Sequence, residues 1–184
     1  MKIVLADGAT REFEGARRAQ DVAAAISPKL AKKALAARID GEARDLSWPV
    51  ADGSRVEILT FEDEAGKKAL WHTASHVMAQ AVKRLYPAAK LAIGPAIDTG
   101  FYYDFDLEKP FSAEDLEAIE AEMRHIVEAD YALERFELPR DAALELVKDE
   151  PYKLELIGDL PEDAKLSFYR QGEFTDLCAG PHAP

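Results

Sequence analysis

The first 62 residues carry short apolar runs separated by turn residues, a pattern that predicts strands and one short helix. Asp21 precedes the apolar run Val22–Ile26 and is typical of a helix N-cap. The expected strands cover Met1–Ala6, Thr10–Gly15, Leu35–Ile39 and Arg55–Phe61. Two strands, a helix and further strands form the order of a β-grasp domain, as in ubiquitin. A generic α+β domain is the alternative that these local signals leave open.

After residue 62 the apolar positions recur at longer, helical intervals. The acidic stretch Glu62–Gly66 is expected to be a linker, and two long amphipathic helices are expected over Lys67–Tyr86 and Ser112–Tyr131. Further elements are two short helices and three strands: Arg140–Lys148, Pro151–Ile157, Phe101–Asp106, Lys165–Arg170 and Glu173–Cys178. The sequence therefore predicts an α+β protein of two domains. A small β-grasp domain covers 1–62, and long helices packed on an antiparallel sheet make up 63–184.

The composition is that of a folded protein, with 184 residues, 48% of them hydrophobic and 32% charged. No apolar run approaches the ~20 residues of a membrane span, and the first residues do not form a secretory signal, so we expect a cytoplasmic protein away from membranes. The net charge of −12 lies in residues 63–184, since residues 1–62 contain ten basic and ten acidic side chains. This acidity excludes a stand-alone nucleic-acid binder driven by charge, and any RNA contact must be local.

Two histidines, His72 and His76, are four residues apart in the first long helix and therefore project from one face. With ~100° per residue, they fall about 200° and 240° from Leu70, opposite the apolar stripe of the helix. The two rings are thus expected away from the core and on one shared face, and a shared face is what a metal site or an acid–base pair requires. A solvated helix face is the alternative.

The second motif is Asp176-Leu-Cys178-Ala-Gly-Pro-His182. Asp176 and Cys178 share a strand face by period two, and Gly180-Pro181 turns the chain so that His182 returns to the same side. Cysteine supplies a thiolate or soft ligand, and histidine a ligand or a base near neutral pH. A lone cysteine buried as a small hydrophobe is the alternative.

The two motifs together hold three of the four histidines and the only cysteine. This single cysteine excludes an internal disulfide and a structural zinc site of several cysteines. The fourth histidine, His125, falls opposite the apolar face of the second long helix, so we expect it at the surface.

The whole chain resembles the N-terminal part of bacterial threonyl-tRNA synthetases. The resemblance rests on the two motifs above, on the stretch Ile93–Asp104 and on Pro151-Tyr-Lys153. It implies a β-grasp module called the TGS domain at 1–62, and at 63–184 an editing domain that removes a wrong amino acid from tRNA. The editing domain of that family extends beyond the position of residue 184, so the domain is expected to be truncated here.

The resemblance also implies an editing pocket. Its expected catalytic residues are His72, His182 and Lys153, with a histidine as the base acting through water and Lys153 either stabilising developing charge or orienting the water. Its expected substrate-binding residues are His76, Cys178, Asp176, Tyr103 and Asp104. Among these, Asp176 would hold the substrate ammonium, and Cys178 and His76 would shape the pocket. Strand alternation alone assigns Tyr103 to the core and Asp104 to the opposite side.

The expected reaction is hydrolysis of the ester in seryl-tRNA for threonine, because a pocket sized for threonine discriminates against the loss of one methyl group by only ~1–3 kcal/mol. No cofactor is expected in this chain. ATP and magnesium belong to a catalytic domain outside it, where the whole enzyme ligates threonine to tRNA. The expected partner is the acceptor end of that tRNA, with the whole enzyme a homodimer and this chain a monomer. Two alternatives remain: a zinc-dependent deacylase with ligands His72, His76, Cys178 and His182, and a non-catalytic β-grasp interaction module.

Overall fold

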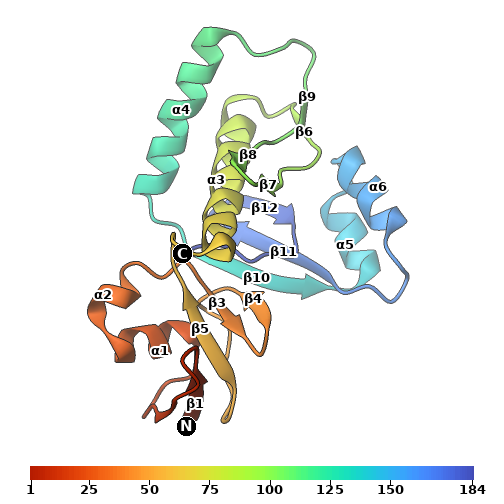
Figure 1. Cartoon of the computed structure of the whole chain (residues 1–184). Coiled ribbons are helices and arrows are strands. Elements are labelled where there is room, and N and C mark those ends of the chain that lie inside the picture. Colours follow the sequence, from red (N-terminus) through yellow and green to blue (C-terminus); the bar gives the residue numbers. More distant parts are fainter. The chain divides into compact units, whose positions relative to one another are not determined.

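The computed structural model describes all 184 residues, and its chain forms two compact units (Figure 1). The first unit comprises Met1–Thr73 together with Gly180–Pro184, and the second comprises Ala74–Ala179. None of the helices has the length and apolar composition that a membrane span requires.

The first unit contains a five-stranded sheet in the order β2-β1-β5-β3-β4. The strands are β1 (Lys2–Leu5), β2 (Thr10–Glu12), β3 (Ala36–Ile39), β4 (Glu42–Arg44) and β5 (Arg55–Leu59). The central strands β1 and β5 run parallel, while the other pairs are antiparallel. Two helices, α1 (Ala19–Ile26) and α2 (Pro28–Ala31), lie between β2 and β3 in the chain. This order is that of a β-grasp sheet, and the α+β fold class is confirmed.

The start of α1 differs from the expectation, because Asp21 is the third helical residue and not the N-cap. Its carboxylate accepts hydrogen bonds from the backbone N–H groups of Arg17 and Arg18, both at 2.9 Å. A carboxylate in the first turn therefore satisfies amides that precede the helix. Ser27 ends α1 and caps α2, since its Oγ accepts from Leu30 N at 3.1 Å.

The long helix α3 (Glu64–Leu85) begins inside the stretch expected to be a linker. Gly66 lies in its first turn, where a Cβ atom would come within 2.0 Å of the Thr60 carbonyl oxygen. Glycine is therefore required at this close approach, and the helix follows β5 almost directly. The expected burial pattern holds only in part: Val77 and Ala81 are buried as expected, but Leu85 is exposed and His76 is only 3% exposed.

The second unit is built around a three-stranded antiparallel sheet in the order β10-β11-β12. The strands are β10 (Leu133–Leu138), β11 (Leu166–Gln171) and β12 (Phe174–Leu177). Sequence analysis missed β10, whose apolar residues are interrupted by charged ones. The two faces of β12 pack against different elements. Phe174 packs near α3, on one face. Leu177, on the other face, joins the apolar cluster of helices α5 (Arg140–Leu146) and α6 (Pro151–Asp159).

Two small two-stranded sheets replace the single strand expected over Phe101–Asp106. Strand β7 (Ala96–Ile97) pairs with β8 (Gly100–Phe101), and β6 (Lys90–Leu91) pairs with β9 (Phe105–Asp106). Tyr103 lies between β8 and β9 and is buried.

Helix α4 (Ala113–Glu128) is capped as expected by Ser112, whose Oγ accepts from Asp115 N at 3.2 Å. Its apolar face is narrower than the sequence predicts, since Ile119 and Ile126 are buried but Leu116 and Val127 are exposed. His125 is at the surface, as expected.

Arg84 of α3 ties three parts of the second unit together. Its guanidinium donates to Glu122 of α4 at 2.8 Å, to both carboxylate oxygens of Glu173 beside β12, and to the Tyr131 hydroxyl. These hydrogen bonds to Arg84 lower the pKa of Glu173 to about 2.

We expect Glu173→Gln to lower the free energy of unfolding at pH 7. The loss should be about 1 kcal/mol, because solvent screens a pair in which the Glu173 side chain is 56% exposed. The wild-type pair stabilises the fold above the ordinary glutamate pKa of 4.5 and is lost as the pH falls toward 2. Chemical denaturation between pH 7 and 2 should therefore show a shallower loss of stability in the variant. Glu145→Gln, which breaks an exposed pair with Lys148, is the control; an equal effect there would contradict the assignment.

Candidate active site

His72 and His182 form a stacked pair within the first unit. Their ring centroids are 4.2 Å apart, with an interplanar angle of 25°. His72 Nδ1 lies 3.3 Å from the Pro181 carbonyl oxygen, which only accepts hydrogen bonds, so this nitrogen carries the proton. In the neutral imidazole the lone pair is then on Nε2.

Thr73 orients the second ring in the same way. Its hydroxyl gives its one proton to a backbone carbonyl, of which Ala69 O is nearest at 3.0 Å. The hydroxyl oxygen must therefore accept from His182 Nδ1 at 3.1 Å and from Ala183 N at 2.9 Å. His182 thus also carries its lone pair on Nε2. The sequence motif did not single out Thr73, although its position between the two histidines of α3 was available.

A buried polar group surrounds Asp176 within the second unit. Lys153 Nζ of α6 lies 2.8 Å from Asp176 Oδ1, and the Tyr103 hydroxyl donates to Asp176 Oδ2 at 2.6 Å. Lys153 Nζ also donates to the Tyr103 hydroxyl at 3.2 Å, and His76 Nε2 lies 3.8 Å from Asp176 Oδ2. The side chains of Lys153 and Asp176 are 5% and 4% exposed, so each charge depends on the other for compensation. Lys153 alone would be taken from sequence for a solvated lysine, and the structure buries it.

The phenol of Tyr103 stays protonated in this surrounding. Burial first, and then the negative charge of Asp176, raise the pKa of Tyr103 far above its ordinary value. A neutral hydroxyl is what the hydrogen bond to Asp176 requires. Gly94 makes room for this ring, because a Cβ atom there would lie 2.0 Å from Tyr103 Cδ2.

A cavity of about 520 Å³ in the second unit borders this polar group. Lys153 and Asp176 line it together with apolar side chains that include Leu91, Phe168 and Phe174. Of the expected site residues, only Lys153 and Asp176 line this cavity. The residues that do not line it are His72, His76, Tyr103, Asp104, Cys178 and His182, and Asp104 is exposed.

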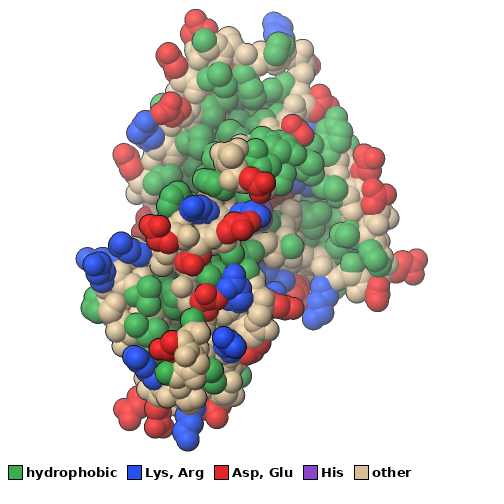
Figure 2. All heavy atoms as spheres, viewed as in Figure 1, with side chains coloured by type: hydrophobic (Ala, Val, Ile, Leu, Met, Phe, Trp, Pro, Cys, Tyr) green, Lys and Arg blue, Asp and Glu red, His purple; other side chains and the backbone are tan.

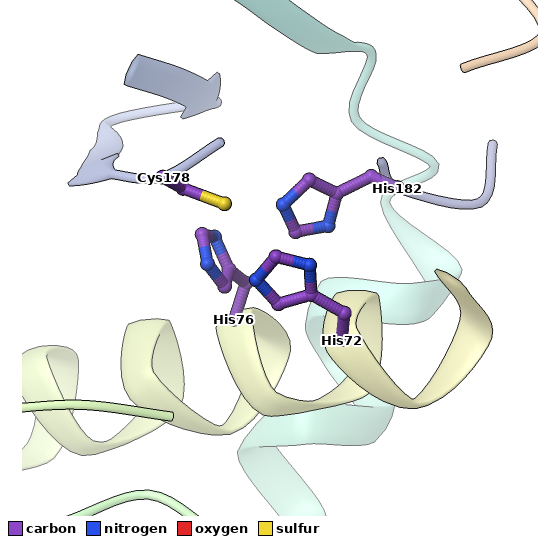
Figure 3. A group of neighbouring side chains, drawn as sticks. All are labelled: His72, His76, Cys178 and His182. Atoms are coloured by element: carbon purple, nitrogen blue, oxygen red, sulfur yellow. The ribbon is translucent and has the colours of Figure 1, made fainter. Parts of the chain in front are cut away.

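Four side chains of the two sequence motifs converge in Figure 3, namely His72, His76, Cys178 and His182. Each offers one ligand atom, and these atoms all lie within 4.8 Å of one another. The Cys178 backbone is anchored on both sides by Ser167, which accepts from Cys178 N and whose Oγ donates to Cys178 O at 2.7 Å.

The donor set fits zinc in kind, because three imidazoles and a thiolate are common zinc ligands. In spacing it is loose, since Zn–N and Zn–S bonds of ~2.0–2.3 Å bring tetrahedral ligand atoms to roughly 3.3–3.8 Å from one another. The separations of up to 4.8 Å would have to shorten for all four to bind one ion. Without an ion, the same group is a cluster of three imidazoles and one cysteine sulfur.

Comparisons with known proteins connect this site to a family. Residues 1–60 match the TGS domain. The chain is 58% identical over 184 residues to the threonine–tRNA ligase of Acetivibrio thermocellus, and 61% identical over 186 residues to that of Clostridium botulinum strain Hall. The matches cover 99% and 100% of this chain but 29% of each relative, so the chain spans less than a third of their length. Residues 1–60 are therefore a TGS domain, and the chain as a whole matches the N-terminal region of threonine–tRNA ligases.

Proposed function

We propose that this chain is the editing region of a threonine–tRNA ligase. Its proposed reaction is hydrolysis of the ester bond in a threonine tRNA that wrongly carries serine. The observation that carries the proposal is the convergence of His72, His76, Cys178 and His182 in one group. In His72 and His182, Nδ1 donates a hydrogen bond. Nε2 is then the basic atom of each ring, as general-base catalysis needs.

The proposed reaction begins with a water molecule activated by Nε2 of His182 or His72. The imidazole takes one water proton while the water oxygen attacks the ester carbon, and the carbonyl oxygen becomes an oxyanion. Collapse of this intermediate breaks the bond to the ribose oxygen, which receives the proton back from the imidazolium. Serine and uncharged tRNA leave.

Lys153 is proposed to stabilise the oxyanion. Its ammonium group is buried, and the attraction between a positive and a negative charge is strongest where water is excluded. We assign Asp176 to holding Lys153 and Tyr103 in place, because its two oxygens already contact these groups. This differs from the expectation that Asp176 holds the substrate ammonium. His76 and Cys178 are proposed to shape the pocket, and Tyr103 to border it.

The proposed partner is the acceptor end of the threonine tRNA. Residues 63–184 are acidic, whereas Lys29, Lys32 and Lys33 are exposed on and beside α2, where Figure 2 shows basic side chains gathered. Such local basic patches suit contact with phosphates. Because the chain spans 29% of its relatives, we assign ligation of threonine, with its ATP and magnesium, to parts of a whole enzyme outside residues 1–184. That enzyme is proposed to be a cytoplasmic homodimer, and this chain a monomer.

The first prediction concerns the histidines. The double variant His72→Ala/His182→Ala should release serine from seryl-tRNA about 100- to 10,000-fold more slowly than the wild-type chain, because the general base is lost. Single-turnover release of labelled serine measures this rate. His125→Ala removes an exposed histidine of α4 and is the matched control, with an unchanged rate. Equal rates for wild type and double variant would instead favour a non-catalytic β-grasp interaction module.

The second prediction separates the catalytic from the structural role of Lys153. Lys153→Met leaves the Asp176 carboxylate buried without its cation and should destabilise the fold by about 3–5 kcal/mol. Adding Asp176→Asn removes that charge, so the double variant should regain much of the stability. Thermal denaturation and serine release are measured together. We expect the double variant to be folded but inactive; wild-type activity in it would contradict the role of Lys153.

The second candidate function is a zinc-dependent deacylase, which the His/Cys group of Figure 3 favours by its donor types. In that case the four side chains would hold the ion, which would supply an activated water when bound. If the histidines act without a metal, chelators should leave the rate of serine release unchanged. Metal analysis of the purified chain decides the question: one zinc per chain, lost in Cys178→Ser together with activity, would establish the zinc enzyme.

A further inference from the structure

Asp45 of the β-grasp domain lies directly after β4, far in sequence from the residues of the proposed site. Its side chain is buried, with the residue only 7% exposed. Its Oδ1 accepts a hydrogen bond from the backbone N–H of His182 at 2.7 Å, across 137 residues of sequence. Both residues belong to the first unit.

Two other aspartates of this domain bind partners inside the β-grasp fold. Asp52 Oδ1 accepts from Lys2 N of β1, and Asp40 accepts from Ser54 Oγ and Arg55 N. These bonds stabilise the β-grasp fold itself. The Asp45 carboxylate, in contrast, reaches the C-terminal segment that carries a histidine of the proposed site. Burying a carboxylate is costly unless it is hydrogen-bonded, so this contact is a specific feature of the fold.

His182 is thereby held at two points. Asp45 holds its backbone N–H, and Thr73 Oγ1 holds its ring at Nδ1 and the next residue at Ala183 N. With its backbone and its ring both held, the His182 ring stacks on His72, and the orientation of His182 Nε2 is fixed. A small displacement of a catalytic group can cost about 100-fold in rate.

We propose that Asp45 is a positioning residue for His182, so that the TGS domain contributes to the editing site. Asp45 accepts a hydrogen bond from the backbone N–H of His182, and we assign it no part in proton transfer. The catalytic part of this inference rests on the proposed function, while the structural part stands on the hydrogen bond alone.

The kinetic test compares three variants of the full chain. Asp45→Ala removes the acceptor and should lower kcat for serine release about 10- to 100-fold with little change in KM. Asp45→Asn keeps an acceptor oxygen at the same place and should stay within a few-fold of wild type. Asp52→Ala breaks a comparable bond to a backbone amide within the domain and is the matched control, with kcat unchanged. A wild-type kcat in Asp45→Ala overturns the inference while leaving the proposed function intact.

The spectroscopic test needs no activity. In ¹⁵N–¹H spectra the His182 amide proton should move upfield in Asp45→Ala, and it should exchange with solvent at least ten-fold faster, whereas Asp52→Ala leaves it unchanged. If Asp45→Ala does not fold, Asp45→Asn decides, because a neutral acceptor weakens the bond and shifts the same proton. An unmoved His182 amide overturns the inference. Absence of serine release from the wild-type chain would instead refute the proposed function, and the amide measurement would still decide whether Asp45 holds His182.

Discussion

The ion pair between Lys153 and Asp176 is the interaction on which the rest of the site depends. Both side chains are almost fully buried, and a lysine ammonium or a carboxylate is stable in such a place only with a compensating charge and hydrogen bonds. Tyr103 supplies the further hydrogen bond to Asp176, and its raised pKa keeps the hydroxyl protonated. The three groups satisfy one another, so helix α6, strand β12 and the loop before β9 must come together for any of them to be buried.

The histidines depend on a different constraint, namely the direction of each ring. The Pro181 carbonyl contacts Nδ1 of His72 and the Thr73 hydroxyl contacts Nδ1 of His182, so that Nε2 of each ring carries the lone pair. The C-terminal segment owes its place partly to Asp45, which lies in a domain with no other residue in the proposed site.

Much of the fold could be predicted from local patterns. Strands β1, β2, β3 and β5, the long helix α3 and the cap at Ser112 follow from periodicity and capping chemistry, which act over a few residues. The short strand β4 was not predicted. Strand β10 was missed because charged residues interrupt its apolar ones, and its pairing with β11 outweighs that weak local pattern. The start of α3 was misassigned because the close approach of Gly66 to Thr60 is a tertiary contact.

The sequence by itself determined which residue types were available for chemistry, since the spacing of His72 and His76 and the Cys178 motif were visible without coordinates. Only the tertiary structure decided that His76 and Lys153 are buried and that Asp45 reaches His182. Burial depends on what packs against a helix face, and a helical wheel contains no information about that neighbour. Short segments of sequence show which reactive residue types are present, whereas the fold as a whole determines which partner a buried charge has.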